Sequence, residues 1–348
     1  MSHKINHKLQ NISIVWFIFS GMLLWLVFIS YMHFLLNTEH SERKIVSLGY
    51  MPVVTNMAAP ILDHASKNVG DIRYKAIKYS SFAEMAESLR NGQIEAAFMI
   101  APLSIVLRQQ GEDVRVVYIG NRHESTFVAR KGLNVKSMND LVGKTVAVPM
   151  RYSGHNLSVL KLIEEKGLTG RINVVEMNPP DMAAALSTGS LDAYYVGEPF
   201  AAQTLKSGDA DLINYVEDVW PGFMCNLVVV RQDYIDENPE IVRGLVQSAV
   251  RSGLWAQKNI KSVTKIAVNY WNQSEGLVEY ALTTPKDRII YDQYVPIEKE
   301  FQYMADLMKQ FNLLESNDIS GLVDDQFAKT ANVDKISTIE SIISNKRD

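Results

Sequence analysis

The stretch that decides the fold is AEMAESLRNGQIEAAFMIAP, residues 83–102, because it returns as PDMAAALSTGSLDAYYVGEP at residues 180–199. The copies align without a gap and agree at Met85 and Met182, Leu89 and Leu186, Gly92 and Gly189, Ala96 and Ala193, and Pro102 and Pro199. Each copy predicts a short helix, a glycine stop, a strand, and a proline that opens a second helix. The repetition predicts two similar α/β lobes. The alternative is chance, since helix-glycine-strand sequences are common in α/β proteins.

Strand and helix patterns also alternate on both sides of the repeat, which is typical of crossover units on a mainly parallel sheet. The predicted strands are 44–51, 73–80, 94–100, 114–120, 145–149, 171–177, 191–197 and 226–230. The predicted helices are 58–68, 82–92, 102–111, 138–142, 155–167, 180–189, 199–208, a long one from about Asn238, 262–271, 297–311 and 316–329. We therefore expect an α/β protein with two lobes.

Composition excludes several classes of protein. The chain has 348 residues, of which 47% are hydrophobic, and a formal net charge of −4. Its charges are mixed and no basic run occurs, so we expect no nucleic-acid partner. Cys225 is the only cysteine, which excludes an internal disulfide and a Cys-rich metal site and favours a small core residue. GxSxG, HExxH, Walker A and GxGxxG motifs are all absent from the sequence.

The N-terminal segment predicts a membrane anchor. Ile12 to Leu36 contains no acidic residue, Lys or Arg, and as a helix it outspans a ~30 Å hydrocarbon core. It is longer than the apolar part of a cleaved signal and lacks a small-x-small cleavage site; a long signal peptide is the alternative. Lys4 and Lys8 predict a cytoplasmic N-terminus at residues 1–11, followed by the anchor at 12–36, a tether at 37–43, and the bulk of the chain outside the cytoplasm.

An ordered set of motifs carries a family resemblance: LGYMP (48–52), NGQIEAAFMIAP (91–102), DLVGKTVAVP (140–149), PPDMAAALSTGSLDAYYVGEP (179–199) and DYIDENPEIV (233–242). The set resembles the extracytoplasmic substrate-binding proteins of nitrate/sulfonate/taurine/bicarbonate ABC importers. The resemblance implies a type II periplasmic-binding-protein fold, in which two α/β lobes close on a ligand cleft. It implies lobe 1 at residues 44–128 and 232–335, lobe 2 at 129–231, and a C-terminal tail at 336–348 that frays.

One stretch departs from this pattern. Nitrate- and bicarbonate-type members of the family tend to carry a charged pair after a Trp, before the strand that returns to the first lobe. Here the stretch is WPGFMCN, and Cys225 and Asn226 occupy the places of the charges. The departure argues against nitrate, bicarbonate and the family's calcium site. We expect no metal and no cofactor.

The candidate ligand-binding residues lie where predicted strands give way to helices. Ligands of open α/β sheets bind beyond the carboxyl ends of the strands, where free helix amides favour anions. The candidates are Gly49, Tyr50, Met51, Ser80, Ser81, Ala101, Pro102, Ser153, Gly154, His155, Gly197 and Glu198, with His123 and Ser125 at a crossing between the lobes. No catalytic residue is expected.

Several candidates also have a purely structural interpretation. Ser80 or Ser81 could cap a helix, Tyr50 could be a core residue, and His123 or His155 could be a surface residue. Glu198 is well placed to cap a helix. A carboxylate facing the cleft would repel a bare anion, so the guest would then need a cationic end or a bridging metal.

The sequence therefore predicts a membrane-anchored, extracytoplasmic binding protein rather than an enzyme. Its expected partners are a small polar or anionic solute (sulfonate-, taurine- or nitrate-like), an ABC permease with its ATPase subunits, and the cytoplasmic membrane. The alternatives are a sensing module that signals through a partner kinase or receptor, and a lyase or dehydratase on the same fold.

Overall fold

The computed structural model describes residues 2–37 and 43–343. The chain divides into two units, residues 1–43 and 44–348. The expected tether residues 38–42 and the last five residues lie outside the described parts.

The first unit is the single helix α1 (Ser2–Asn37). Trp16–Phe34 has a mean hydropathy of 1.8, and this part of α1 is long and apolar enough to cross a membrane. Large apolar side chains such as Phe17, Leu24 and Trp25 are between 66% and 82% exposed. A long signal sequence near the N-terminus can meet the same limits of length and hydropathy, so the helix by itself is compatible with both uses.

The first sheet of the second unit has the strand order β2-β1-β3-β10-β4. Its strands are β1 (Lys44–Tyr50), β2 (Ile72–Lys78), β3 (Ala96–Ile100), β4 (Val114–Ile119) and β10 (Asn226–Arg231). β1 is parallel to β2 and β3, whereas β10 is antiparallel to β3 and β4. β3 and the first five residues of β10 are fully buried, as expected for strands covered by helices on both faces.

The second sheet repeats this arrangement in the order β7-β6-β8-β5-β9. Its strands are β5 (Ser125–Arg130), β6 (Thr145–Val148), β7 (Asn173–Glu176), β8 (Ala193–Gly197) and β9 (Ala210–Tyr215). β6 is parallel to β7 and β8, whereas β5 is antiparallel to β8 and β9.

The sequence repeat corresponds to this structural repeat. β3 and β8 hold the same third place in their sheets, each between a helix stopped by a glycine and a helix begun at a proline. Gly92 and Gly189 have φ values of +69° and +79°, the left-handed conformation that glycine adopts without strain. The two-lobed α/β fold is therefore confirmed.

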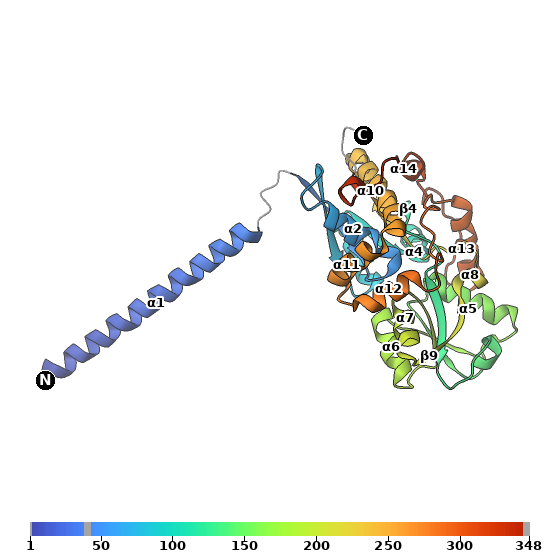
Figure 1. Ribbon diagram of the computed structural model, residues 1–348, viewed down its shortest axis with the longest axis horizontal. Coiled ribbons are helices and arrows are strands. Elements are labelled where there is room, and N and C mark those ends of the chain that lie inside the picture. The colour runs from blue at the N-terminus through green and yellow to red at the C-terminus, as the bar shows by residue number, and fades with distance from the viewer. Residues whose placement is uncertain (1, 38–42, 344–348) are drawn as a thin grey trace. The chain divides into compact units, whose positions relative to one another are not determined.

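Helices cover both sheets. Around the first sheet lie α2 (Ala58–Ala65), α3 (Phe82–Arg90), α4 (Ala101–Gln109), α9 (Gln232–Glu237), α10 (Pro239–Lys258), α11 (Ile260–Trp271) and α14 (Gln326–Lys329). Around the second lie α5 (Gly154–Glu165), α6 (Pro179–Ser187), α7 (Phe200–Ser207) and α8 (Val216–Val219). Figure 1 shows α5, α6, α7 and β9 grouped apart from α2, α10, α11 and α14.

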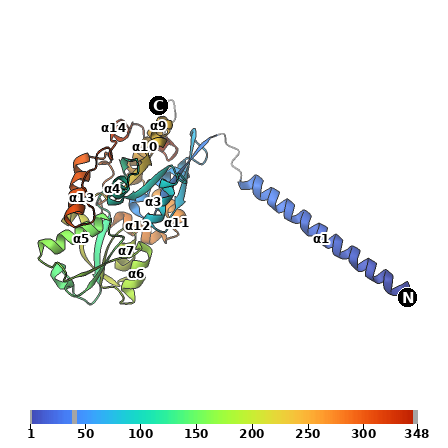
Figure 2. The same cartoon turned by 180° about the vertical axis from the view of Figure 1, so that it is seen from behind.

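Two helices touch both groups. α12 (Glu275–Thr283) packs on α11 and α7, and α13 (Glu298–Gln310) packs on α4 and α5. Both views show α13 beside α5 (Figures 1 and 2). Gln310 donates a hydrogen bond to Glu164 of α5 at 2.6 Å, which joins the C-terminal helices to the second lobe.

Strand pairing places the crossing strands differently from the expected lobe limits. Residues 125–128, expected in lobe 1, belong to β5 of the second sheet. Residues 226–231, expected in lobe 2, form β10 of the first sheet. Each crossing strand is antiparallel to its neighbours and belongs to the sheet of the lobe that the chain is entering. The remaining lobe limits stay a prediction.

The C-terminal third differs most from expectation. The helix predicted at 316–329 is wrong over most of its length, since only α14 is helical there. Gly321 has a φ of +72°, and Val323 bridges Val116 of β4, so the segment follows the sheet edge instead. The expected tail is also ordered as far as Ile343, because Ile342 and Ile343 are buried. Neither β9 nor α12 was predicted.

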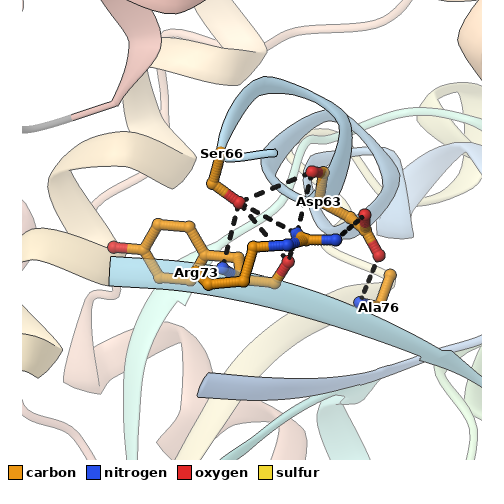
Figure 3. Close-up of polar contacts among 5 residues, drawn as sticks. Asp63, Ser66, Arg73 and Ala76 are labelled. Atoms are coloured by element: carbon orange, nitrogen blue, oxygen red, sulfur yellow. Dashed lines mark hydrogen bonds and ion pairs between the residues drawn. The ribbon is translucent and has the colours of Figure 1, made fainter. Parts of the chain in front are cut away.

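A buried ion pair holds α2 against β2 (Figure 3). The Arg73 guanidinium donates a hydrogen bond to the Asp63 carboxylate at 2.9 Å, and the other Asp63 oxygen accepts one from the Ala76 amide at 2.8 Å. Both charged side chains are about nine-tenths buried. Burial of two charges is tolerated only when each is paired and hydrogen-bonded, as here.

Candidate functional site

The two crossings between the sheets lie side by side. The first is residues 120–124, between β4 and β5, and the second is residues 216–225, between β9 and β10. Arg122 forms a bridge with Met224, and the His123 amide donates to the Phe223 carbonyl at 3.3 Å. The Val54 amide, from the short helix η1 (Val54–Asn56) after β1, donates to the Glu198 carbonyl at 2.8 Å. Segments of both lobes therefore converge here.

A group of polar side chains is buried at this convergence, which we call the crossover cluster. Each member is at most 6% exposed. The members are Glu124, Ser125, Thr126, His155, Glu198 and Cys225. They come from the first crossing and β5, the start of α5, the end of β8, and the second crossing.

Hydrogen bonds connect most of the cluster. Ser125 Oγ donates to Glu124 Oε1 at 2.9 Å and lies 2.8 Å from His155 Nε2. Glu124 Oε2 accepts a bond from the Glu198 amide at 2.7 Å. The thiol of Cys225 donates to Asn226 Oδ1 at 3.1 Å, and its sulfur lies 3.9 Å from His155 Nε2.

Both carboxylate oxygens of Glu198 accept hydrogen bonds from the protein itself. One carboxylate oxygen accepts a bond from Thr126 Oγ1 at 2.7 Å, and the other accepts from the Ala202 amide at 2.7 Å. The second bond caps the start of α7, which is the structural role foreseen for this residue. Burial raises the pKa of Glu198 to about 7, despite the hydrogen bonds that favour its charged form.

Arg288 is the cation of this region. Its guanidinium donates to Thr126 Oγ1 at 2.9 Å and to the Ser125 carbonyl, pairs with Glu217 at 2.7 Å, and lies over the ring of Tyr215. Arg288 stabilises the charged forms of three carboxyl groups. It pairs directly with Glu217, and its charge lowers the pKa values of Glu124 and Glu198 against the effect of burial. Negative charge therefore exceeds positive charge around the cluster when all three carboxyl groups are ionised.

Buried polar atoms without partners mark the same place. His155 Nδ1, Tyr195 Oη and Asn226 Nδ2 have no hydrogen-bond partner among the residues that the structure describes. His155 contacts the rings of Tyr195 and Phe223 at centroid distances of 5.7 Å. A buried polar group without a partner costs about 1–3 kcal/mol, so these three atoms are candidate contact points for a bound molecule.

Burial favours the uncharged forms of the potential nucleophile and base of the cluster in this conformation. Burial lowers the pKa of His155 to about 3, so its imidazole is neutral. Burial raises the pKa of the Cys225 thiol well above its ordinary value, and the pKa of Glu124 is also raised by burial. A catalytic thiol usually has a lowered pKa and a close base, whereas the pKa of Cys225 is raised and its sulfur makes only a long contact of 3.9 Å with His155 Nε2.

A separate cavity of about 280 Å³ lies between the two lobes. Its walls come from the end of β1, the start of α3, the loop after β6 and the start of α6. They are Met51, Ser81, Phe82, Ala83, Pro149, Met150, Glu176, Met177, Asn178 and Pro179. Its mostly apolar lining with a few polar groups suits a small solute with a short hydrocarbon part.

The structure brings together some predicted site residues. Ser125, His155 and Glu198 belong to the crossover cluster, and Met51 and Ser81 line the cavity. Three more support these residues closely. A Cβ atom on Gly154 would lie 2.6 Å from the Phe223 ring, and one on Gly197 would lie 2.7 Å from the Glu124 carboxylate. Ser153 caps α5 by accepting a bond from the Asn156 amide at 3.1 Å.

The other predicted residues have internal roles. The Tyr50 hydroxyl bonds to the Tyr270 carbonyl, Gly49 packs against Ile94 and Met85, and Ser80 bonds to Glu84 at the surface. The Ala101 amide bonds to the Cys225 carbonyl at 2.9 Å, and Pro102 is buried in the first turn of α4. His123 Nε2 accepts a bond from the Gly222 amide at 2.8 Å, and burial lowers its pKa.

Sequence reasoning missed Glu124, Tyr195 and Arg288. Glu124 and Arg288 stand in polar stretches, NRHEST and PKDR, that are typical of surface loops. Only the antiparallel crossing buries them. Tyr195 could have been found, since it is the one polar aromatic in the repeat that replaces a phenylalanine, Phe98.

Comparisons with known proteins agree with this architecture. The model of the NMT1-like family matches residues 39–268. The taurine-binding periplasmic protein of Escherichia coli is 26% identical over 177 residues, 50% of this chain and 54% of that protein. The nitrate/nitrite binding protein NrtA of Synechococcus elongatus is 22% identical over 251 residues, 62% of this chain and 56% of that protein. The chain thus spans about half the length of these relatives.

Solved structures share the fold. The ligand-binding component of an ABC-type import system from Staphylococcus aureus, solved with zinc bound, has a TM-score of 0.75 at 22% identity, covering 84% of this chain and all of that one. The desulfurization enzyme DSZB has a TM-score of 0.58 at 15% identity, so the fold alone does not separate binding from catalysis. Because the family model covers well over half of the sequence, the chain belongs to the NMT1-like family.

Proposed function

We propose that the chain is a membrane-anchored, extracytoplasmic solute-binding protein of an ABC importer. The observation that carries the proposal is the set of buried, unpartnered atoms at the crossings, His155 Nδ1, Tyr195 Oη and Asn226 Nδ2. A guest held between the lobes would supply their partners. Family membership and the cavity between the lobes support the same role.

The charge balance refines the solute class. Glu124, Glu198 and Glu217 lie near the cation Arg288, and in their ionised forms these three carboxyl groups repel a bare anion and favour an ammonium group. The names of the relatives include taurine and nitrate binders. Among sulfonate-, taurine- and nitrate-like solutes, the site favours a small zwitterion with an amine over nitrate.

Helix α1 supports the anchored arrangement, with residues 44–348 outside the cytoplasm at the cytoplasmic membrane. A permease and an ATPase are the partners that an importer requires. Alkaline extraction of membranes tests the anchor: the full-length chain stays in the pellet, and its release into the supernatant contradicts anchoring.

The site chemistry disfavours the enzyme alternative, since neither Cys225 nor His155 is activated. A sensing module would bind a solute in the same way as an import protein, and it would differ only in the partner protein to which it docks. Incubated solutes are expected to return intact; turnover would instead favour a lyase or dehydratase. A copurifying permease supports import, whereas a copurifying kinase supports sensing.

A pair of adjacent tyrosines provides the sharpest binding test. Within the described part of the chain Tyr195 Oη has no hydrogen-bond partner, whereas Tyr194 Oη bonds to the Phe200 carbonyl at 2.9 Å and to Thr204. Tyr195→Phe should weaken solute binding about three- to tenfold without lowering the stability of the free protein. Tyr194→Phe should cost about 1 kcal/mol of stability and leave affinity unchanged.

The measurement is calorimetry on the full-length chain in detergent, with taurine, alkanesulfonates, nitrate, bicarbonate and pyrimidines as candidate solutes. A thermal-shift screen selects the solute first, because a tight guest raises apparent stability. Equal affinities in wild type and Tyr195→Phe would remove the crossover cluster from the binding site. Unchanged small-angle scattering at saturation would argue against closure of the lobes.

A further inference from the structure

Three different metal-binding side chains meet inside the crossover cluster. One donor atom from each of Glu124, His155 and Cys225 lies within 4.8 Å of the other two. The side chains are 1%, 1% and 6% exposed. They stand 31 and 70 positions apart in the sequence (155 − 124 and 225 − 155), so only the fold brings them together.

The spacing is close to that of a tetrahedral zinc site. Ligand atoms at about 2.0–2.3 Å from zinc lie roughly 3.3–3.8 Å from one another. Cys225 Sγ and His155 Nε2 are already 3.9 Å apart. Contraction of the triangle by up to about 1.5 Å completes the geometry, and side-chain rotations supply movements of this size.

Ser125 is the remaining polar group beside these donors. Its hydroxyl lies 2.8 Å from His155 Nε2 and 2.9 Å from Glu124 Oε1. The Ser125 hydroxyl either becomes the fourth ligand of the metal, through its oxygen, or rotates away and leaves the fourth coordination position to water or to a solute. The second imidazole nitrogen, Nδ1, has no partner among the described residues, so no hydrogen bond of that atom opposes the rotation of the ring.

Charge favours a divalent cation here. The cluster buries two carboxyl groups, those of Glu124 and Glu198, near Arg288, which is itself paired with Glu217. A zinc ion bound by the Glu124 carboxylate, the Cys225 thiolate and a neutral His155 forms an electroneutral unit, because two negative ligands balance the 2+ charge. The thiol proton leaves to solvent when the metal binds.

The donor set selects the kind of metal. A thiolate and an imidazole suit zinc and similar borderline ions, whereas calcium and magnesium require oxygen ligands. We propose that Glu124, His155 and Cys225 form a binding site for a zinc-like transition-metal ion at the two crossings. The site links the first crossing, helix α5 of the second lobe and the second crossing, so metal binding holds the lobes together.

Cobalt substitution tests the site. Co²⁺ is added to the full-length chain without a histidine tag, in detergent. One equivalent should bind and give both a tetrahedral visible spectrum and a thiolate-to-cobalt charge-transfer band, and Zn²⁺ should displace it. Cys225→Ser should abolish the charge-transfer band, and Glu124→Gln should weaken cobalt binding at least tenfold.

The controls keep the result interpretable. His64→Asn changes an exposed histidine of α2 and should leave the cobalt spectrum unchanged. Circular dichroism without metal verifies that Cys225→Ser folds, and if Glu124→Gln does not fold, the cysteine variant decides alone. A wild-type spectrum without a thiolate band, or equal cobalt affinity in Cys225→Ser, would overturn the site. The inference does not rest on the import role, because cobalt binding is measured without any solute.

Discussion

The Glu198 carboxylate accepts a hydrogen bond from the Thr126 hydroxyl at 2.7 Å, and this bond joins the end of β8 to β5 inside a site that is closed to solvent. Burial raises the pKa of Glu198 from 4.5 to about 7. Between these values the folded chain holds a proton that the unfolded chain has released. This group therefore makes stability fall as pH rises from about 4.5 to about 7, by up to about 3 kcal/mol.

Glu198→Gln should remove most of that slope, because an amide does not titrate. Urea unfolding of wild type and variant across this pH range measures the difference. Glu240→Gln, at an exposed residue of α10, is the control and should keep the wild-type slope. Parallel curves for wild type and Glu198→Gln would show that the carboxyl titrates normally.

Arg288 should be the most sensitive single residue at the crossings. Its side chain is 4% exposed and holds Glu217, Thr126 and the Ser125 carbonyl together. Arg288→Ala should cost about 3–5 kcal/mol, because it leaves buried carboxyl groups without their cation. The stability of Arg288→Lys should fall between those of the wild type and Arg288→Ala, because a lysine ammonium keeps the charge but cannot make the forked contacts of a guanidinium. Chemical denaturation checks both; a loss below 1 kcal/mol for the alanine variant contradicts this role.

The ion pair of Figure 3 should matter more than a surface pair of similar length. Asp63→Ala leaves Arg73 buried and without its carboxylate, at a cost of about 3–5 kcal/mol. Asp113→Ala breaks surface pairs with Arg108 and Arg115, in which the Asp113 carboxylate is 58% exposed, at a cost of about 1 kcal/mol or less. Thermal melts of the two variants test the contrast, and equal shifts would refute it.

Gly120 should tolerate no side chain. A Cβ atom there would collide with the carbonyl oxygen of Thr55, which is backbone and cannot rotate away. Gly120→Ala should therefore cost about 1–3 kcal/mol. In Gly276→Ala the new methyl group meets only the end of Lys206, at 3.9 Å, and the change should stabilise α12 by up to about 1 kcal/mol. Opposite shifts in melting temperature are expected, and shifts of the same sign would contradict the close approach at Gly120.

Cys225 should react slowly while the chain is folded. Burial raises the pKa of its thiol, so little thiolate is present at neutral pH. Iodoacetamide should label the native chain at least tenfold more slowly than the urea-unfolded chain. Mass spectrometry reads the result directly, since no other cysteine is present. Rapid native labelling would indicate an activated thiol and revive the enzyme alternative.

Local patterns were sufficient to predict the layers of the fold. The sequence shows where helices end at Gly92 and Gly189, and it shows the strands of fully buried residues. Both features are determined by residues close to one another in the chain. The segment 316–329 was misassigned because its contact with Val116 of β4 depends on a residue two hundred positions away. The pairing of β5 with β8 is hidden for the same reason.

The site was only partly visible in the sequence. His155 and Glu198 were found because they lie where predicted strands give way to helices, and Ser125 because it lies at the expected crossing between the lobes. Glu124 and Arg288 were not, because a charged residue in a polar stretch is usually exposed, and only tertiary packing shows otherwise. The meeting of Glu124, His155 and Cys225 depends on both crossings at once, and no spacing along the chain encodes it.

The packing of α13 against both α4 and α5 ties the two lobes together beside the crossings, where Glu300 of α13 pairs with Arg122 at 2.9 Å and Tyr303 contacts the Trp220 ring. Outward swing of one lobe has to break the bond between Gln310 and Glu164 and the contact between Lys161 and Tyr303. These bonds lie on the protein surface, far along the chain from the crossings. We therefore expect the strength of these contacts to affect how often the lobes separate, and so to change the association rate of the proposed solute from positions outside its binding site.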